Sequence, residues 1–174
     1  GSIEKEFLEE FGHPCPEAMV KSLEKYVSFC EAHGFTKLVL SVKSSDVSMM
    51  IRVNEMVAER FPYPLHLGVT EAGTERMGII KSSAGIGGLL CEGIGDTIRV
   101  SLTADPVREV HAAHDLLTSL GLDNRIQFVS CPTCGRCHVD LIRIAEETER
   151  ALTGIRKNIK VALMGCAVNG PGEA

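Results

Sequence analysis

Hydrophobic positions along the chain follow two periods that alternate. Apolar residues spaced three or four apart, the period of an amphipathic helix, recur in residues 16–33, 45–61, 73–93, 106–120 and 138–152. Short continuous apolar runs, which are typical of buried strands, occupy residues 37–42, 65–69, 98–102, 126–130 and 160–164. After the first helix, the pattern therefore predicts strands and helices in strict alternation.

This alternation predicts an α/β fold built on a parallel sheet. Each predicted strand is followed by a predicted helix, and successive strands begin roughly 30 residues apart, the size of a βα unit. Strands that are apolar on both faces fit a sheet with helices on one side and a barrel interior or a second helix layer on the other.

Polar side chains stand at the carboxyl ends of three predicted strands, where a (β/α) barrel binds its ligands. Lys43 follows the first strand, Glu71 follows the second, and Arg99 and Ser101 share one face of the third. We expect Arg99 to point into a buried face, where an unpaired charge would cost several kcal/mol, so either Glu71 or a bound phosphate must lie beside it. Lys43, Arg99 and Ser101 thus form a candidate anion site. Glu71 is either a general acid or base or the N-cap of the next helix.

Two other features receive structural interpretations. The glycine-rich stretch from Gly85 to Gly95 matches neither GxGxxG nor GxxxxGK[ST], so we expect a helix whose small residues pack closely on the sheet. His66, His111 and His114 have no partner at a metal-ligand spacing, so we expect packing or surface histidines.

Cysteines carry the strongest motif. Cys131 and Cys134 form a CxxC directly after a predicted strand, and Cys166 follows the next strand, so a strand–helix–strand unit returns a third thiol toward the first two. The motif fits a thioredoxin-like redox pair, half of a zinc ribbon or an iron–sulfur cluster, and Cys166 favours a metal. Cys137 would complete a set of four thiolates, and spacing leaves the fourth ligand open. The remaining cysteines, which lie in helical stretches, are expected to be inert and buried: Cys15, Cys30 and Cys91.

Composition narrows the possible partners. The 174 residues are 44% hydrophobic and 24% charged, as in a globular protein, and the net charge of -5 with 5% aromatic residues argues against nucleic-acid binding. The apolar stretch at residues 161–168 is far shorter than the ~18 residues that a membrane span needs. An odd number of cysteines, seven, suits a reducing compartment, so we expect a cytoplasmic protein that contacts neither membrane nor nucleic acid.

Several long segments together resemble one enzyme family, the 4-hydroxy-3-methylbut-2-enyl diphosphate synthases. The segments are GSIEKEFLEEFG, LVLSVKSSDV, YPLHLGVTEAG, KSSAGIGGLLCEGIGDTIRVSLTADP, SCPTCGR and MGCAVNGPGEA, and they cover essentially the whole chain. The resemblance implies an iron–sulfur oxidoreductase of isoprenoid precursor biosynthesis. Such an enzyme reductively opens 2-C-methyl-D-erythritol 2,4-cyclodiphosphate at a [4Fe-4S] cluster.

The resemblance also implies a domain organisation and partners. Residues 1–125 would hold the last three βα units of a (β/α)8 barrel, and residues 126–174 the first part of an α/β cluster domain. The chain would then be a fragment of a bacterial-type enzyme, inactive by itself. The complete enzyme would be a homodimer that receives electrons from flavodoxin or ferredoxin.

Carried over by motif, the resemblance assigns roles to particular residues. The cyclic diphosphate substrate would contact Lys43, Arg99 and Ser101, and the catalytic carboxylate would be Glu71. The cluster ligands would be Cys131, Cys134, Cys166 and Glu173.

The fourth ligand of the metal site is either the Cys137 thiol or the Glu173 carboxylate. Cys137 departs from the family pattern. One alternative is a zinc-binding structural module held by four thiols, those of Cys131, Cys134, Cys137 and Cys166. Another alternative is a thiol–disulfide oxidoreductase. We favour Glu173, because a helix beginning near His138 would turn the Cys137 thiol away, and because a carboxylate leaves one iron exchangeable.

Overall fold

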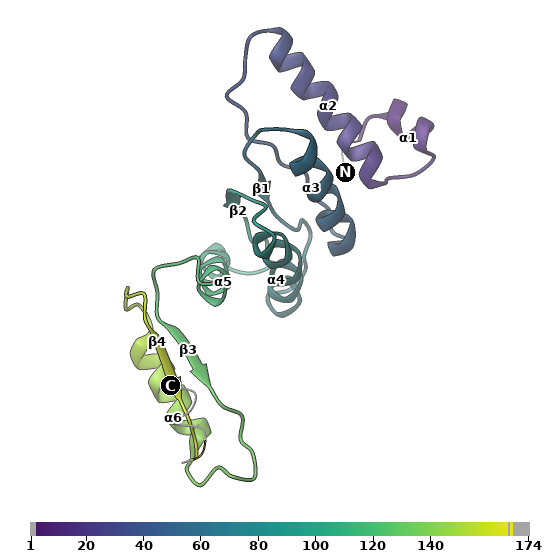
Figure 1. Ribbon diagram of the computed structural model, residues 1–174. Helices are drawn as coiled ribbons and strands as arrows, with labels where there is room; N and C mark the ends of the chain where they lie inside the picture. The colour runs from purple at the N-terminus through teal and green to yellow at the C-terminus, as the bar shows by residue number, and fades with distance from the viewer. Residues whose placement is uncertain (1–2, 167, 169–174) are drawn as a thin grey trace. The chain divides into compact units, whose positions relative to one another are not determined.

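A computed structural model of the chain describes residues 3–166 and 168. It divides into two compact units, Gly1–Leu116 and Leu117–Ala174 (Figure 1). None of the helices in the described part combines the length and apolar composition that a membrane crossing requires.

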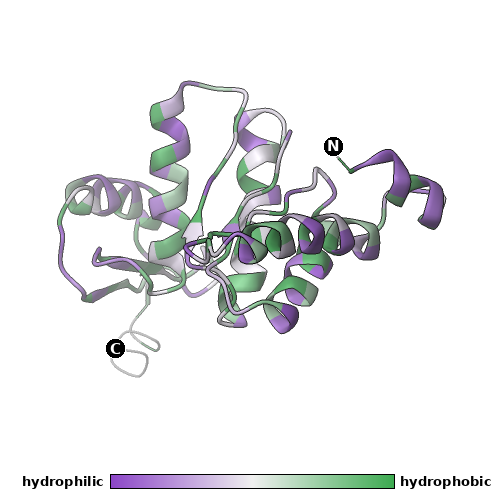
Figure 2. Ribbon diagram, turned by 90° about the horizontal axis from the view of Figure 1, so that it is seen from above, coloured by the Kyte–Doolittle hydropathy of each residue, from purple (hydrophilic) through white to green (hydrophobic). Residues whose placement is uncertain are grey.

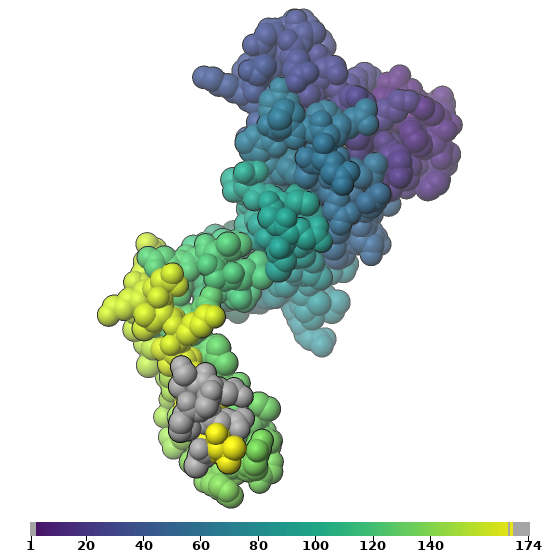
Figure 3. Space-filling view, viewed as in Figure 1, coloured from purple at the N-terminus to yellow at the C-terminus, as the bar shows by residue number. Residues whose placement is uncertain are grey.

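Two helices open the first unit. Helix α1 (Lys5–Phe11), which the pattern did not predict, packs its buried Phe7 against α2 (Pro16–Ala32). Pro16 suits the first turn of α2, as predicted, since its missing N–H would have no partner there. The space-filling view shows these helices joined to the rest of the unit, and α2 packs on α3 (Val47–Arg60) (Figure 3).

Three parallel segments, each followed by a helix, form the centre of the first unit. Strand β1 (His66–Leu67) pairs with β2 (Thr97–Ile98), and isolated bridges join Leu40 to Leu65 and Ser44 to Val69. The segments lead into α3, α4 (Glu75–Cys91) and α5 (Pro106–Ser119). The α/β alternation is therefore confirmed.

The strand lengths differ from the prediction. Residues 37–42 contain one isolated bridge, at Leu40, instead of a strand, and the strand expected at 98–102 is found at Thr97–Ile98. Each outer segment has a parallel neighbour on one side only among the described residues, so few ladder hydrogen bonds can form.

Alternate residues of the segments form the core with the helices. The buried apolar side chains are Leu40, Val42, Leu65, Leu67, Val69 and Val100 from the segments, with Met50, Val53, Val57, Ile86 and Leu89 from α3 and α4. Hydrophobic and hydrophilic residues alternate along the ribbons of the helices (Figure 2). A side chain on Gly85 of α4 would place its first carbon 3.0 Å from Val69 Cγ2, which confirms the prediction of a closely packed, glycine-containing helix.

One buried polar residue ties α3 to the first segment. Asn54 Nδ2 donates to the carbonyl oxygens of Val42, at 3.1 Å, and Met50, at 2.8 Å. Val42 directly precedes Lys43, so this bond fixes the backbone from which the lysine side chain leaves.

The second unit is a strand–helix–strand motif, as predicted. Strand β3 (Gln127–Ser130) pairs in parallel with β4 (Lys160–Leu163), with Ser130 opposite Leu163, and α6 (Leu141–Leu152) connects them. The helix begins three residues later than expected, because the Asp140 carboxylate accepts from the backbone N–H of Arg143 and caps it there.

Candidate functional site

Lys43 and Arg99 lie on the face of the three segments opposite the buried core. Arg99 is exposed while its neighbour Val100 is buried, so the prediction that Arg99 points into a buried face is wrong. Val100 occupies the helix-facing position, and strand alternation places Arg99 and the half-buried Ser101 on the opposite side. Of the two partners considered for Arg99, Glu71 or a bound phosphate, Glu71 forms no ion pair with it in the described structure. Within residues 3–166 neither Lys43 nor Arg99 has an ion-pair partner.

The two cations repel each other. Burial lowers the pKa of Lys43, and the charge of Arg99 lowers it further. Burial also lowers the pKa of His66, and Lys43 and Arg99 lower it again. A bound anion would relieve this repulsion, so the arrangement favours a negatively charged ligand.

His66 belongs to this cluster, although its sequence context predicted an ordinary packing or surface histidine. Its Nδ1 atom lies 2.8 Å from Thr97 Oγ1. The charges of both cations lower the pKa of the imidazole ring. Because Leu65 and Leu67 are apolar and buried, strand alternation already placed His66 on the open face. Only the pairing with the neighbouring segments brings Lys43 and Arg99 near it.

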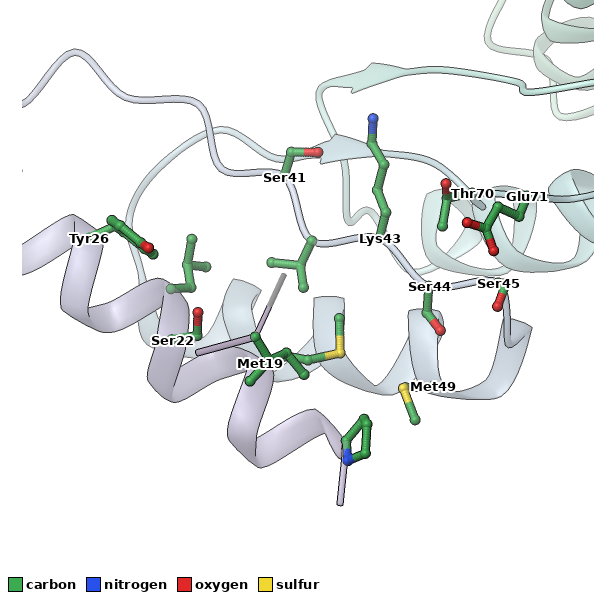
Figure 4. Close-up of a pocket in the computed structure, with 14 residues that line it drawn as sticks. Met19, Ser22, Tyr26, Ser41, Lys43, Ser44, Ser45, Met49, Thr70 and Glu71 are labelled. Atoms are coloured by element: carbon green, nitrogen blue, oxygen red, sulfur yellow. The ribbon is translucent and has the colours of Figure 1, made fainter. Parts of the chain in front are cut away.

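A cavity of about 580 Å³ lies at the carboxyl ends of the first two segments (Figure 4). Met19, Ser22 and Tyr26 of α2 line it, together with Ser41, Lys43, Ser44, Ser45, Met49, Thr70 and Glu71. The Lys43 side chain extends away from Met19 and Ser22, and Glu71 lies beside Thr70 (Figure 4). Lys43 and Glu71 both line the cavity, but the Lys43 ammonium points away from its α2 wall, and neither Arg99 nor Ser101 belongs to the lining.

Glu71 has an unusual backbone conformation. Its φ of 51° is in the left-handed region, the only such value among the described non-glycine residues, and a non-glycine residue there costs about 1 kcal/mol. The alternative in which Glu71 caps the next helix is wrong, because Thr74 occupies the N-cap of α4. Its exposed carboxylate is thus available at the cavity.

Cys131 lies beside the chain that leads to Cys166. The backbone N–H of Cys131 donates to Leu163 O at 3.1 Å, and its Sγ accepts from the N–H of Gly165 at 3.2 Å. The exposed Cys134 has a lowered pKa, chiefly because the backbone N–H of Arg136 stabilises the thiolate. Within the described part of the chain, no three His, Cys, Asp or Glu side chains are gathered tightly enough to hold a metal ion. Glu173 lies outside the described residues.

The expectation for Cys137 is corrected. Because α6 begins at Leu141, no helix turns the thiol aside. Its Sγ lies 3.4 Å from Val139 O and would be 2.7 Å from the first side-chain carbon at Gly165, the residue that also contacts Cys131. The expectation that the other three cysteines are buried is also wrong: Cys91 is exposed, and Cys15 and Cys30 are partly exposed.

Comparisons with known proteins match both units. The family model described as the GcpE TIM-barrel domain matches residues 1–114, and that of the GcpE protein C-terminal domain matches residues 127–174. Relatives called 4-hydroxy-3-methylbut-2-en-1-yl diphosphate synthase (flavodoxin) are 53% identical in Clostridium tetani and 54% in Clostridium perfringens, each over 100% of this chain and 50% of the relative. The relative of that name in Geobacter sulfurreducens is 52% identical over the same shares. The chain thus spans about half the length of the curated relatives it matches.

Proposed function

Because the chain belongs to the GcpE family, we propose that it supplies substrate-binding and cluster-binding residues of a 4-hydroxy-3-methylbut-2-en-1-yl diphosphate synthase. In the whole protein this enzyme would reductively open 2-C-methyl-D-erythritol 2,4-cyclodiphosphate, with loss of water, to the allylic diphosphate. The observation that carries the proposal is the pair of cations Lys43 and Arg99, which lack ion-pair partners in the described structure and share the open face of the parallel segments.

The two matched regions support a domain assignment. We assign the three βα units of the first unit to the last three of a (β/α)8 barrel. The strand–helix–strand motif would open the cluster domain, with the boundary near residue 125. The second match, to residues 127–174, includes all four proposed cluster ligands.

Lys43 and Arg99 would bind the diphosphate group. An arginine guanidinium can donate two parallel hydrogen bonds to phosphoryl oxygens, and the lysine ammonium adds a compact charge beside it. Ser101 stands two residues beyond Arg99 on the same face and would donate its hydroxyl to the same group. Glu71, which lines the cavity with Lys43, would then hold or transfer the proton of a substrate hydroxyl.

A [4Fe-4S] cluster would be held by Cys131, Cys134, Cys166 and Glu173. The thiols fit this soft metal site, and the contact of Cys131 with Gly165 places two of the cysteine-bearing segments side by side. When bound, the cluster supplies electrons and, through its carboxylate-held iron, an exchangeable Lewis-acid position. The zinc and thiol–disulfide alternatives gain no support from the relatives, which carry the synthase name.

Partners follow from the same proposal. The names of the relatives specify flavodoxin, so we propose flavodoxin as the electron donor. A homodimer and a cytoplasmic location complete the proposed assembly.

The function is tested by anaerobic reconstitution of the whole protein with iron and sulfide, followed by an absorbance spectrum, metal analysis and turnover of the cyclic diphosphate. We expect a brown protein with about four irons and sulfides per chain that forms the allylic product with reduced flavodoxin. Bound zinc without iron, or a metal-free reversible disulfide, would refute the proposal, since each has its own spectral and analytical signature.

Replacing Arg99 with Ala should weaken substrate binding. Loss of a hydrogen bond to a charged group costs about 1.5–3 kcal/mol, so we expect an increase of roughly 10- to 150-fold in the KM of the whole protein. Arg52→Ala is the matched control, because Arg52 is exposed on α3 and pairs with Glu55 at 3.2 Å. An unchanged KM and turnover in Arg99→Ala would remove Arg99 from the site.

A further inference from the structure

Gly68 stands between the two cations. Strand pairing sets the register on both sides: Ser44 is opposite Val69, and Leu67 is opposite Ile98. One step along each pairing places Gly68 level with both Lys43 and Arg99. The backbone confirms the second alignment, because the N–H of Arg99 donates to Leu67 O at 2.9 Å.

The Lys43 side chain lies against Gly68. A side chain at residue 68 would place its first carbon 3.4 Å from Lys43 Cε and 3.6 Å from Cδ, and only 3.1 Å from the carbonyl oxygen of Arg99. The methylene chain of the lysine is therefore in ordinary van der Waals contact with this position, and the branches of a larger residue such as valine would enter the space that it occupies. We call this space, over Gly68 and between the flanking side chains of His66 and Thr70 on the same face, the lysine channel.

Backbone geometry does not explain the glycine. Gly68 is buried, and its φ angle is not positive, so an L-residue could adopt its backbone conformation. Glycine in a strand weakens it, and such a residue often marks a close approach by another group. Here the closest approach is by the carbonyl oxygen of Arg99, at 3.1 Å, and the stem of Lys43 packs beside it in van der Waals contact.

We propose that Gly68 is a positioning residue that holds the Lys43 ammonium beside Arg99, so that one diphosphate can bridge both cations. A free lysine side chain loses about 2 kcal/mol of rotamer entropy when fixed, and repulsion from Arg99 would drive it into solvent. Packing the stem in the lysine channel restricts those alternatives before the ligand arrives. This inference rests on the proposed function, which assigns the two cations to a diphosphate site.

The test measures binding of inorganic pyrophosphate to the whole protein by calorimetry, in a double-mutant cycle. The variants are Gly68→Val, Lys43→Ala and the double variant, with the milder Gly68→Ala as a graded step. We expect Gly68→Val and Lys43→Ala each to weaken binding about 10-fold, and Gly68→Val to add less than about 2-fold when Lys43 is already Ala. Gly88→Ala is the control, because its new carbon would make an ordinary 3.7 Å contact with Ile51.

A second readout needs no ligand. Acetylation of Lys43 followed over pH by peptide mapping reports the pKa of its amine, which burial and Arg99 lower. The titratable groups around it are Arg99, His66 and Glu71, and none of these is altered in Gly68→Val. Once the ammonium swings away from Arg99, the pKa should rise toward that of an ordinary lysine, whereas a loss of stability alone would not move it in the folded protein.

The possible outcomes distinguish a failure of the Gly68 inference from a failure of the proposed anion site. If Lys43→Ala binds pyrophosphate normally but the labelling shift appears in Gly68→Val, Gly68 positions Lys43 and the anion site is wrong. If Lys43→Ala loses affinity while Gly68→Val changes neither affinity nor labelling, the inference is wrong and the anion site stands. Equal losses by Gly68→Val with and without Lys43 would also overturn it. Should Gly68→Val fail to fold, Gly68→Ser, which adds one atom beyond the first side-chain carbon, carries the same comparison with smaller changes in the same directions.

Discussion

Cys131→Ser is expected to abolish assembly of the cluster in the whole protein. A serine hydroxyl does not ionise near neutral pH and is a poor ligand for iron, so removing this thiolate leaves too few donors of the required softness. Cys131 also connects the two halves of the proposed site, because its Sγ accepts from the N–H of Gly165 next to Cys166. We expect iron and sulfide content after anaerobic reconstitution to fall to background, and synthase activity to vanish with it.

Cys137→Ser is the matched control for this change. Cys137 also lies against Gly165, so both substitutions remove a thiol from the same neighbourhood. We expect Cys137→Ser to keep both cluster and activity. Glu173→Ala should lose activity, because the exchangeable iron would lose its carboxylate. If Cys137→Ser loses the cluster while Glu173→Ala keeps cluster and turnover, the fourth ligand is Cys137 and the site is one of four thiolates.

Glu71→Gln is expected to lower kcat of the whole protein by about 10²- to 10⁴-fold, the range for losing a general acid or base. Glutamine keeps the size and hydrogen-bonding reach of the side chain but cannot take up or release the proton. Cluster content and the melting temperature should remain normal. Glu75→Gln, which changes a half-buried carboxylate of α4 that pairs with Arg108 of α5, should leave kcat unchanged.

The backbone of Glu71 separates a functional role from a structural one. Glycine adopts a φ of 51° without strain, so Glu71→Gly should melt at the same or a higher temperature while losing activity. Near-normal turnover in Glu71→Gln with full cluster content would show that Glu71 does not carry the chemistry.

Apolar periodicity alone predicted the α/β alternation, the helix at Pro16–Ala32 and the strand–helix–strand motif of the second unit. These features depend on local spacing, which a helix or strand needs in order to bury one face. The glycine-rich helix α4 was also predictable, because its spacing excluded a phosphate loop. Helix α1 escaped prediction, because seven residues with one buried side chain are too short for a clear period.

The sequence by itself therefore determined the order of elements, the positions of polar residues at the carboxyl ends of strands and the CxxC motif. Only the tertiary structure decided which residues meet. It turned Arg99 to the open face because Val100 occupies the helix-facing position, placed His66 with two cations, and brought Gly68 under the Lys43 stem. The physical reason is that side-chain alternation is a local property of one strand, whereas the register between parallel segments depends on contacts between residues far apart in the chain.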